Sequence, residues 1–83
     1  MKSHAYKPTP EDVAWARNLV SILKDGGTWV CSWGTYRLNK VSRQVELLLT
    51  YPWFPEERLS ELFHMTERTF EEVGYTVTGQ KGG

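Results

Sequence analysis

The sequence predicts a two-layer α+β domain in the element order α-β-β-β-α-β, with an antiparallel meander packed against two amphipathic helices. Two observations lead to this prediction: apolar residues recur at helical spacing near both ends of the chain, whereas they alternate with polar residues in the middle. Glycine and proline mark the turns between these segments. A chain of 83 residues is long enough for one such domain.

The first helix is expected to begin after Thr9, which can cap it, with Pro10 at the first helical position and Asp12 completing a capping box. It should run for about 15 residues with a broad apolar face. The residues of this face are Val13, Ala16, Leu19, Val20 and Leu23, with Trp15 and Ile22 at its margins. Gly26 or Gly27 then ends the helix.

Residues 28–38 are expected to form a β-hairpin whose two-residue loop is Trp33 and Gly34. This register sets Cys31 opposite Tyr36. The core face of the hairpin then carries Trp29, Cys31, Tyr36 and Leu38.

Residues 44–51 alternate as a third strand, although Leu48 breaks the pattern. Its core face is expected to carry Val45, Leu47, Leu49 and Tyr51. Pro52 and Pro55 must end this strand because proline donates no backbone hydrogen bond, and Pro55 suits the start of a second helix. That helix should run to Val73 with a possible break near Thr66, and residues 75–78 have the composition of a short fourth strand.

The domain is expected to cover residues 9–78, between a flexible N-terminal arm at residues 1–8 and a flexible tail at residues 79–83. The first ten residues contain no apolar run typical of a signal peptide, so we expect a soluble, cytoplasmic protein without a membrane span.

Neither a metal nor a cofactor is expected. The soft or imidazole ligands are His4, Cys31 and His64, and no two of them have the short paired spacing of a zinc site. No nucleophile, base and orienting group can be placed together, so the chain is predicted not to be an enzyme. Cys31 is interpreted as a small buried hydrophobe and His64 as a solvated or interface residue.

Basic and acidic residues are equal in number, ten of each, but they are unevenly placed. Cations prevail in the predicted hairpin region, whereas glutamates prevail in the second helix. The domain is therefore expected to be polarised, with a basic sheet side and one acidic helix.

The aromatic content indicates a binding surface, because four tryptophans and four tyrosines exceed what so small a core readily hides. Trp33 at the hairpin tip and Trp53 and Phe54 between the two prolines are the candidate partner-binding aromatics, joined by Glu57 and Glu61 of the acidic helix. Two alternatives stay open. Trp53 and Phe54 could instead close the open end of the core, or the same surface could form a homodimer.

A nucleic-acid-binding module is the second hypothesis, with Arg37, Lys40 and Arg43 beside Trp33 as a small single-strand platform. The element order also resembles a double-stranded RNA-binding domain, but Glu56 and Glu57 stand where that family has phosphate-binding lysines. A third hypothesis is that the acidic helix imitates a phosphate array. Its glutamates are Glu56, Glu57, Glu61, Glu67, Glu71 and Glu72.

A further resemblance extends over most of residues 10–78. The segments 25–30, 35–38 and 69–77, with sequences DGGTWV, TYRL and TFEEVGYTV, look like small uncharacterised accessory proteins of tailed bacteriophages. Many of those proteins carry Pro-Arg-Ser-Gly where this chain has CSWG at residues 31–34. The resemblance implies a phage-encoded protein that binds a host or phage protein, possibly as an inhibitor, in the cytoplasm of a bacterial cell.

Overall fold

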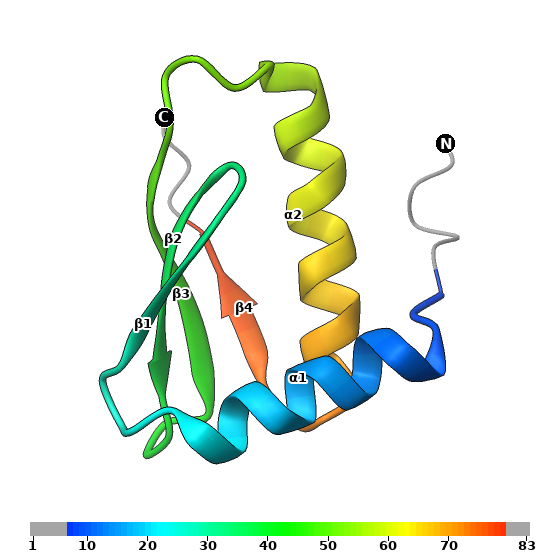
Figure 1. The fold of residues 1–83 in the computed structure, drawn as a ribbon, viewed down its shortest axis with the longest axis vertical. Coiled ribbons are helices and arrows are strands. Elements are labelled where there is room, and N and C mark those ends of the chain that lie inside the picture. Colours follow the sequence, from blue (N-terminus) through cyan, green and yellow to red (C-terminus); the bar gives the residue numbers. More distant parts are fainter. Residues whose placement is uncertain (1–6, 80–83) are drawn as a thin grey trace.

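Four strands form one sheet in the order β1-β2-β3-β4, and two helices complete the fold (Figure 1). The computed structural model describes residues 7–79, so most of the predicted arm at residues 1–8 and of the predicted tail at residues 79–83 lies outside the described residues. The elements are α1 (Pro10–Ile22), β1 (Thr28–Cys31), β2 (Gly34–Asn39), β3 (Gln44–Thr50), α2 (Glu56–Glu71) and β4 (Thr76–Thr78). The predicted α+β class and element order are confirmed.

The sheet is antiparallel from β1 to β3, whereas β4 lies parallel to β3. This parallel pairing is possible because α2 carries the chain back across the sheet before β4 begins. No helix within residues 7–79 has the length and apolar character needed to cross a membrane.

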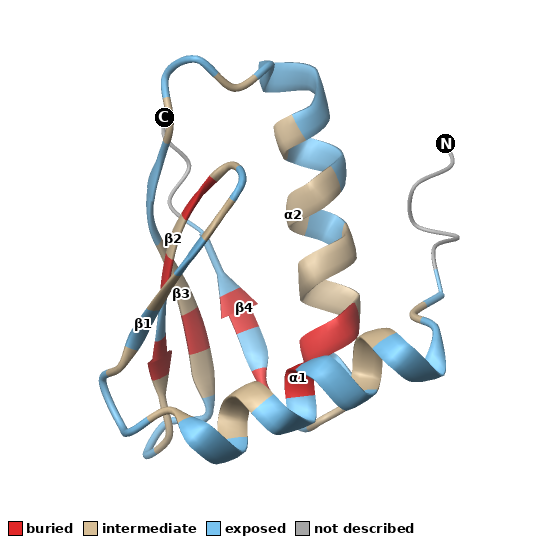
Figure 2. Cartoon of the chain, viewed as in Figure 1, coloured by how far each residue is buried: buried red, intermediate tan, exposed pale blue. Residues whose placement is uncertain are grey.

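The core lies between the helices and the inner face of the sheet, as the buried residues in Figure 2 show. All four strands except β1 contribute a fully or almost fully buried side chain, and both helices add one or more. The buried apolar residues are Ala16, Tyr36, Leu38, Val45, Phe70, Tyr75 and Val77. The described residues leave the outer face of the sheet without a helix above it.

The capping box at the start of α1 is formed as predicted. The Thr9 hydroxyl accepts a hydrogen bond from the Asp12 backbone N–H at 3.1 Å, and the Thr9 N–H donates to the Asp12 carboxylate at 3.3 Å. These bonds satisfy donors that the first turn of a helix leaves unpaired. Gly26, with φ +84°, then allows the chain to turn toward β1.

The predicted register of the hairpin is wrong by two residues. Cys31 pairs with Gly34 and Trp29 with Tyr36, so the loop is Ser32 and Trp33. The faces are nevertheless as predicted, because a shift by an even number of residues keeps each side chain on its side of the sheet. Gly34 does not serve the turn. It lies within β2, where a Cβ atom would collide with the Leu49 carbonyl oxygen of β3.

Leu49 was expected in the core, and that prediction is wrong. An irregularity in the pairing of β2 with β3 leaves Leu48 without a partner and sets Leu49 opposite Thr35 on the outer face. A bulge of this kind inserts one extra residue and reverses the alternation beyond it. Both leucines are consequently exposed, Leu49 to 50%.

The second helix is continuous, so the break considered near Thr66 does not occur. The Thr66 hydroxyl donates to the Leu62 carbonyl at 2.9 Å within the helix. Gly74, with φ +87°, follows the helix end, and the Tyr75 N–H donates to the Phe70 carbonyl at 3.0 Å. This geometry leads the chain directly into β4.

Candidate functional sites

The tip of the β1–β2 hairpin and the β3–α2 loop lie together at one end of the molecule (Figure 1). The Tyr51 N–H donates to the Trp33 carbonyl at 3.0 Å, and the rings of Trp33 and Phe54 lie 6.4 Å apart. The Trp33 indole N–H also donates to the Tyr36 hydroxyl at 3.0 Å. Trp33 was expected to be an exposed tip residue, but these contacts make it a half-buried support for the loop.

Trp53 and Phe54 have opposite environments, although they are neighbours in the sequence. Trp53 is 74% exposed and stacks on Tyr51, with ring centroids 4.8 Å apart and planes inclined by 15°. Phe54 is half-buried beside Trp33. The predicted exposure therefore holds for Trp53, whereas Phe54 has the packing role that the alternative described.

Glu57 and Glu61 are exposed in the first turns of α2, directly after this loop. The surface that these glutamates form with Leu49 and Trp53 is called the Trp53 end below. Sequence reasoning missed Leu49 as a surface residue, because the β-bulge that turns it outward leaves no signal except the broken alternation at Leu48.

The three predicted basic residues do not form a platform beside Trp33. Trp33 precedes β2, whereas Lys40 and Arg43 follow it in the β2–β3 turn, and six strand residues span about 20 Å. Arg37 lies between them on the outer face, where its guanidinium contacts the Glu46 carboxylate at 2.9 and 3.1 Å. That part of the prediction is wrong, since the sequence does not show which end of a strand a neighbouring turn occupies.

The acidic residues of α2 do not act as one uniform array. The Glu67 carboxylate lies 3.2 Å from Nδ1 of His64, which is exposed as predicted. Glu71 and Glu72 lie at the opposite end of α2 from Glu57, beside basic side chains of other segments. Only the first turns of the helix therefore present carboxylates without a described cation close by.

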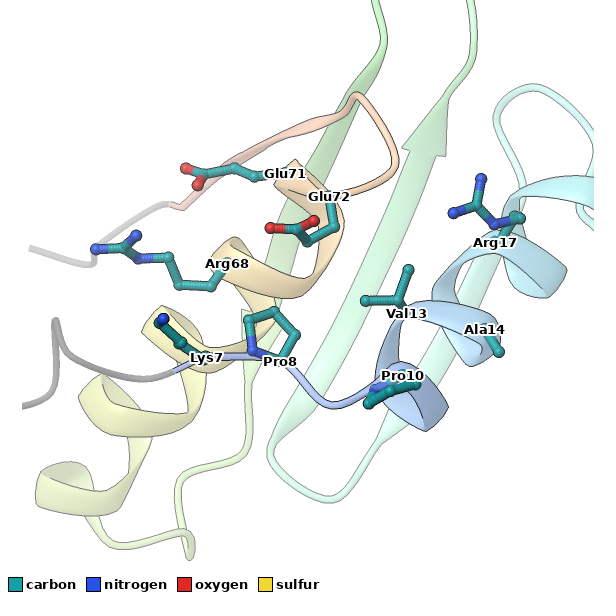
Figure 3. Close-up of a pocket in the computed structure, with 9 residues that line it drawn as sticks. All are labelled: Lys7, Pro8, Pro10, Val13, Ala14, Arg17, Arg68, Glu71 and Glu72. Carbon is teal, nitrogen blue, oxygen red and sulfur yellow. The ribbon is translucent and has the colours of Figure 1, made fainter.

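Those basic side chains belong to an open groove of about 670 Å³ between the segment before α1, α1 itself and the end of α2 (Figure 3). Lys7, Arg17 and Arg68 contribute positive charge, and Glu71 and Glu72 contribute negative charge. The sequence did not predict this groove, because it depends on how α1 packs against α2. Charges of both signs compensate one another here, so the groove selects no class of ligand.

A smaller cleft of about 180 Å³ lies between the β1–β2 hairpin, the inner side of α2 and the first turns of α1. It is called the aromatic cleft below, because three tryptophans and a tyrosine border it. Its lining residues are Asp12, Trp15, Trp29, Cys31, Trp33, Tyr36, Leu62, Met65, Thr66 and Thr69. Each aromatic residue was predicted to lie in the core, at a helix margin or at the tip, but their convergence was not predicted.

Burial raises the pKa of both ionisable groups on the hairpin side of this cleft. For Tyr36 the raising effect of burial outweighs the lowering effect of hydrogen bonds from Trp33 and Thr66. For Cys31 burial likewise outweighs hydrogen bonds to the backbone of Trp33 and Gly34, so its raised pKa keeps it a thiol at neutral pH. The thiol donates to the Gly34 carbonyl, with a sulfur–oxygen distance of 3.4 Å.

We expect Tyr36 to make the fold sensitive to alkaline pH. Its folded-state pKa is raised above the ordinary value near 10, so its contribution to stability is complete below pH 10 and is lost as the pH rises above it. Tyr36→Phe should decline less in this range, while costing about 1–2 kcal/mol at pH 7 because the Trp33 N–H loses its acceptor. Urea unfolding of both proteins from pH 7 to 11 measures this, and parallel declines would contradict it.

Within residues 7–79 no group of three or more histidine, cysteine, aspartate or glutamate side chains is arranged to hold a metal ion. Comparison with protein-family models, curated proteins and solved structures finds no match to this chain. The geometry of its surfaces is therefore the basis for a function.

Proposed function

We propose that this protein is a non-enzymatic interaction module that binds a partner protein through the Trp53 end. The observation that supports this most directly is the 74% exposure of Trp53 on a loop whose neighbouring residues are anchored. An exposed indole in water is unfavourable, but it becomes a strong binding anchor when a partner covers it.

The loop that carries Trp53 is held from both sides. Tyr51 bonds to the hairpin tip and stacks under the Trp53 ring, while Phe54 packs beside Trp33. Because the backbone and the stacking partner are fixed, little conformational entropy is lost when Trp53 is buried by a partner. The loop thus presents the indole in a preorganised way.

The chemistry around Trp53 specifies the kind of partner. Leu49 adds a half-exposed apolar side chain at the end of β3, and Glu57 and Glu61 add negative charge at the start of α2. A complementary surface would offer an apolar pocket bordered by basic residues. The resemblance to phage accessory proteins makes a host protein the proposed partner, with inhibition as the proposed effect.

Trp53→Ala is expected to weaken partner binding by about 30-fold or more, since buried tryptophan anchors contribute about 2 kcal/mol or more. Val41→Ala is the matched control, because Val41 is 85% exposed in the turn at the far end of β2. A protein captured from bacterial lysate by wild type is purified, and its affinity for the variants is measured by calorimetry. Equal affinity for Trp53→Ala and wild type would refute the role of this end.

The charged residues of the Trp53 end have a separate readout. Glu57→Gln combined with Glu61→Gln should slow association and flatten its salt dependence, with little change in dissociation. If the partner is a second copy of this chain, sedimentation will show a dimer that Trp53→Ala disperses. The nucleic-acid hypothesis is checked by titration with single- and double-stranded oligonucleotides at low salt, where the absence of binding ends it.

A further inference from the structure

The rings that border the aromatic cleft stand in two nearly perpendicular orientations. Trp29 and Tyr36 are almost parallel, with centroids 5.3 Å apart and planes inclined by 13°. Trp15 meets Trp29 at 78°, and Trp33 meets Tyr36 at 86°, each with centroids 6.4 Å apart. The cleft is therefore enclosed by aromatic walls that come from α1, β1, the hairpin tip and β2.

One charged side chain stands among these walls, and it is an acid. Asp12 borders the cleft from the first turn of α1, where its carboxylate accepts the Thr9 N–H. No lysine, arginine or histidine lines the cleft. Aromatic faces carry partial negative charge, so the rings and the carboxylate both favour a cation.

The polar groups of the cleft indicate which kind of cation fits. The hydroxyl protons of Thr66 and Thr69 are directed to the carbonyls of Leu62 and Met65, at 2.9 and 2.8 Å. A primary ammonium group has three N–H donors that need acceptors, and the cleft provides few. A quaternary ammonium group has no such donors, and it is bound instead through contact with aromatic rings.

The size of the cleft and its access to solvent limit the ligand further. A volume of about 180 Å³ lies below the roughly 300–1,000 Å³ of pockets that hold drug-sized molecules. Trp15, which forms one wall, is 48% exposed, so the cleft can be reached from solvent. The space suits a small head group.

From these observations we infer that the aromatic cleft binds a small quaternary ammonium compound of the choline type. The trimethylammonium group lies among Trp15, Trp29 and Trp33, with Asp12 balancing its charge. This site is separate from the Trp53 end, so the two proposals stand or fall independently.

The first experiment compares three ligands on one protein and needs no variant of the cleft. Choline and 3,3-dimethyl-1-butanol have the same shape and differ in charge, whereas ethanolamine keeps the charge but is a primary amine. The protein carries Trp53→Phe, which removes the exposed indole from the fluorescence signal. Binding is followed by the quenching of the remaining tryptophans.

Choline should give saturable quenching, and it should bind at least about tenfold more tightly than either comparison ligand, as expected for contact of a cation with several rings. Equal affinity for choline and 3,3-dimethyl-1-butanol would overturn the inference, since the cleft would then be merely apolar. The absence of saturation up to ~10 mM choline would also overturn it.

Two variants then assign the contributions of single residues. Trp15→Leu keeps an apolar wall but removes the aromatic face, so it should weaken choline binding by about fivefold and leave the neutral ligand almost unchanged. Asp12→Asn should weaken choline by about threefold, again without an effect on the neutral ligand. Urea unfolding confirms that each variant is folded, and unchanged choline affinity in both folded variants contradicts the assignment.

Discussion

Gly34→Ala is expected to leave the protein largely unfolded at room temperature. Gly34 is buried in β2, and a Cβ atom there would lie against the Leu49 carbonyl oxygen, with the Thr50 Cα at 3.1 Å. Both obstacles are backbone atoms of β3, so relief requires the two strands to separate. Such a disruption costs roughly 3 kcal/mol or more, and a chain of this length has about 4–12 kcal/mol of stability in total.

Gly26→Ala is the matched control for this experiment. Gly26 has φ +84° but no atom within 4 Å of the position that a Cβ would take, so this change carries the conformational cost alone. That cost is about 1–2 kcal/mol. Urea unfolding followed by tryptophan fluorescence compares the two variants, and a Gly34→Ala midpoint at or above that of Gly26→Ala would show that the strands can adjust.

Phe70→Ala is expected to have the second largest effect, a loss of about 3–5 kcal/mol. Phe70 is fully buried at the end of α2, and its ring lies 5.8 Å from that of Trp15 and 5.7 Å from that of Trp29. Removing the ring leaves a cavity where α1, α2 and β1 meet. The aromatic cleft then loses the support behind two of its walls.

Phe70→Leu separates volume from aromatic contact, because it refills most of the cavity without a ring. We expect it to cost about 1–1.5 kcal/mol. Near-ultraviolet circular dichroism reports the tryptophan environment, and urea unfolding gives the stability of each variant. A Phe70→Ala protein that lost less than about 1 kcal/mol would show that Phe70 is not the centre of the core.

Two of the surface predictions illustrate the limit of sequence reasoning. Proline on both sides of Trp53 forces a surface loop, and the exposure of Trp53 followed from that local constraint. Trp33 was placed at the tip correctly but expected to be exposed. Its burial depends on Phe54 and Tyr36, and the contact with Phe54 spans 21 positions of the chain.

The aromatic cleft was invisible for a related reason. Trp15 looked like a helix margin and Trp29 like a core residue, and each description was reasonable for its own element. The cleft exists because α1, α2 and the hairpin meet without filling the space between them. Periodicity in a sequence specifies which side of an element is apolar, but not how completely three such sides interlock.

The sequence by itself determined the order of the elements, the cap of α1 and the inner face of each strand up to Leu47. These features depend on residues a few positions apart, whose backbone preferences act locally. The tertiary structure decided the hairpin register, the bulge at Leu48, the two fates of Trp53 and Phe54, and the walls of the aromatic cleft. Each of these depends on close packing between distant segments, where a single Cβ atom at Gly34 decides whether two strands can approach.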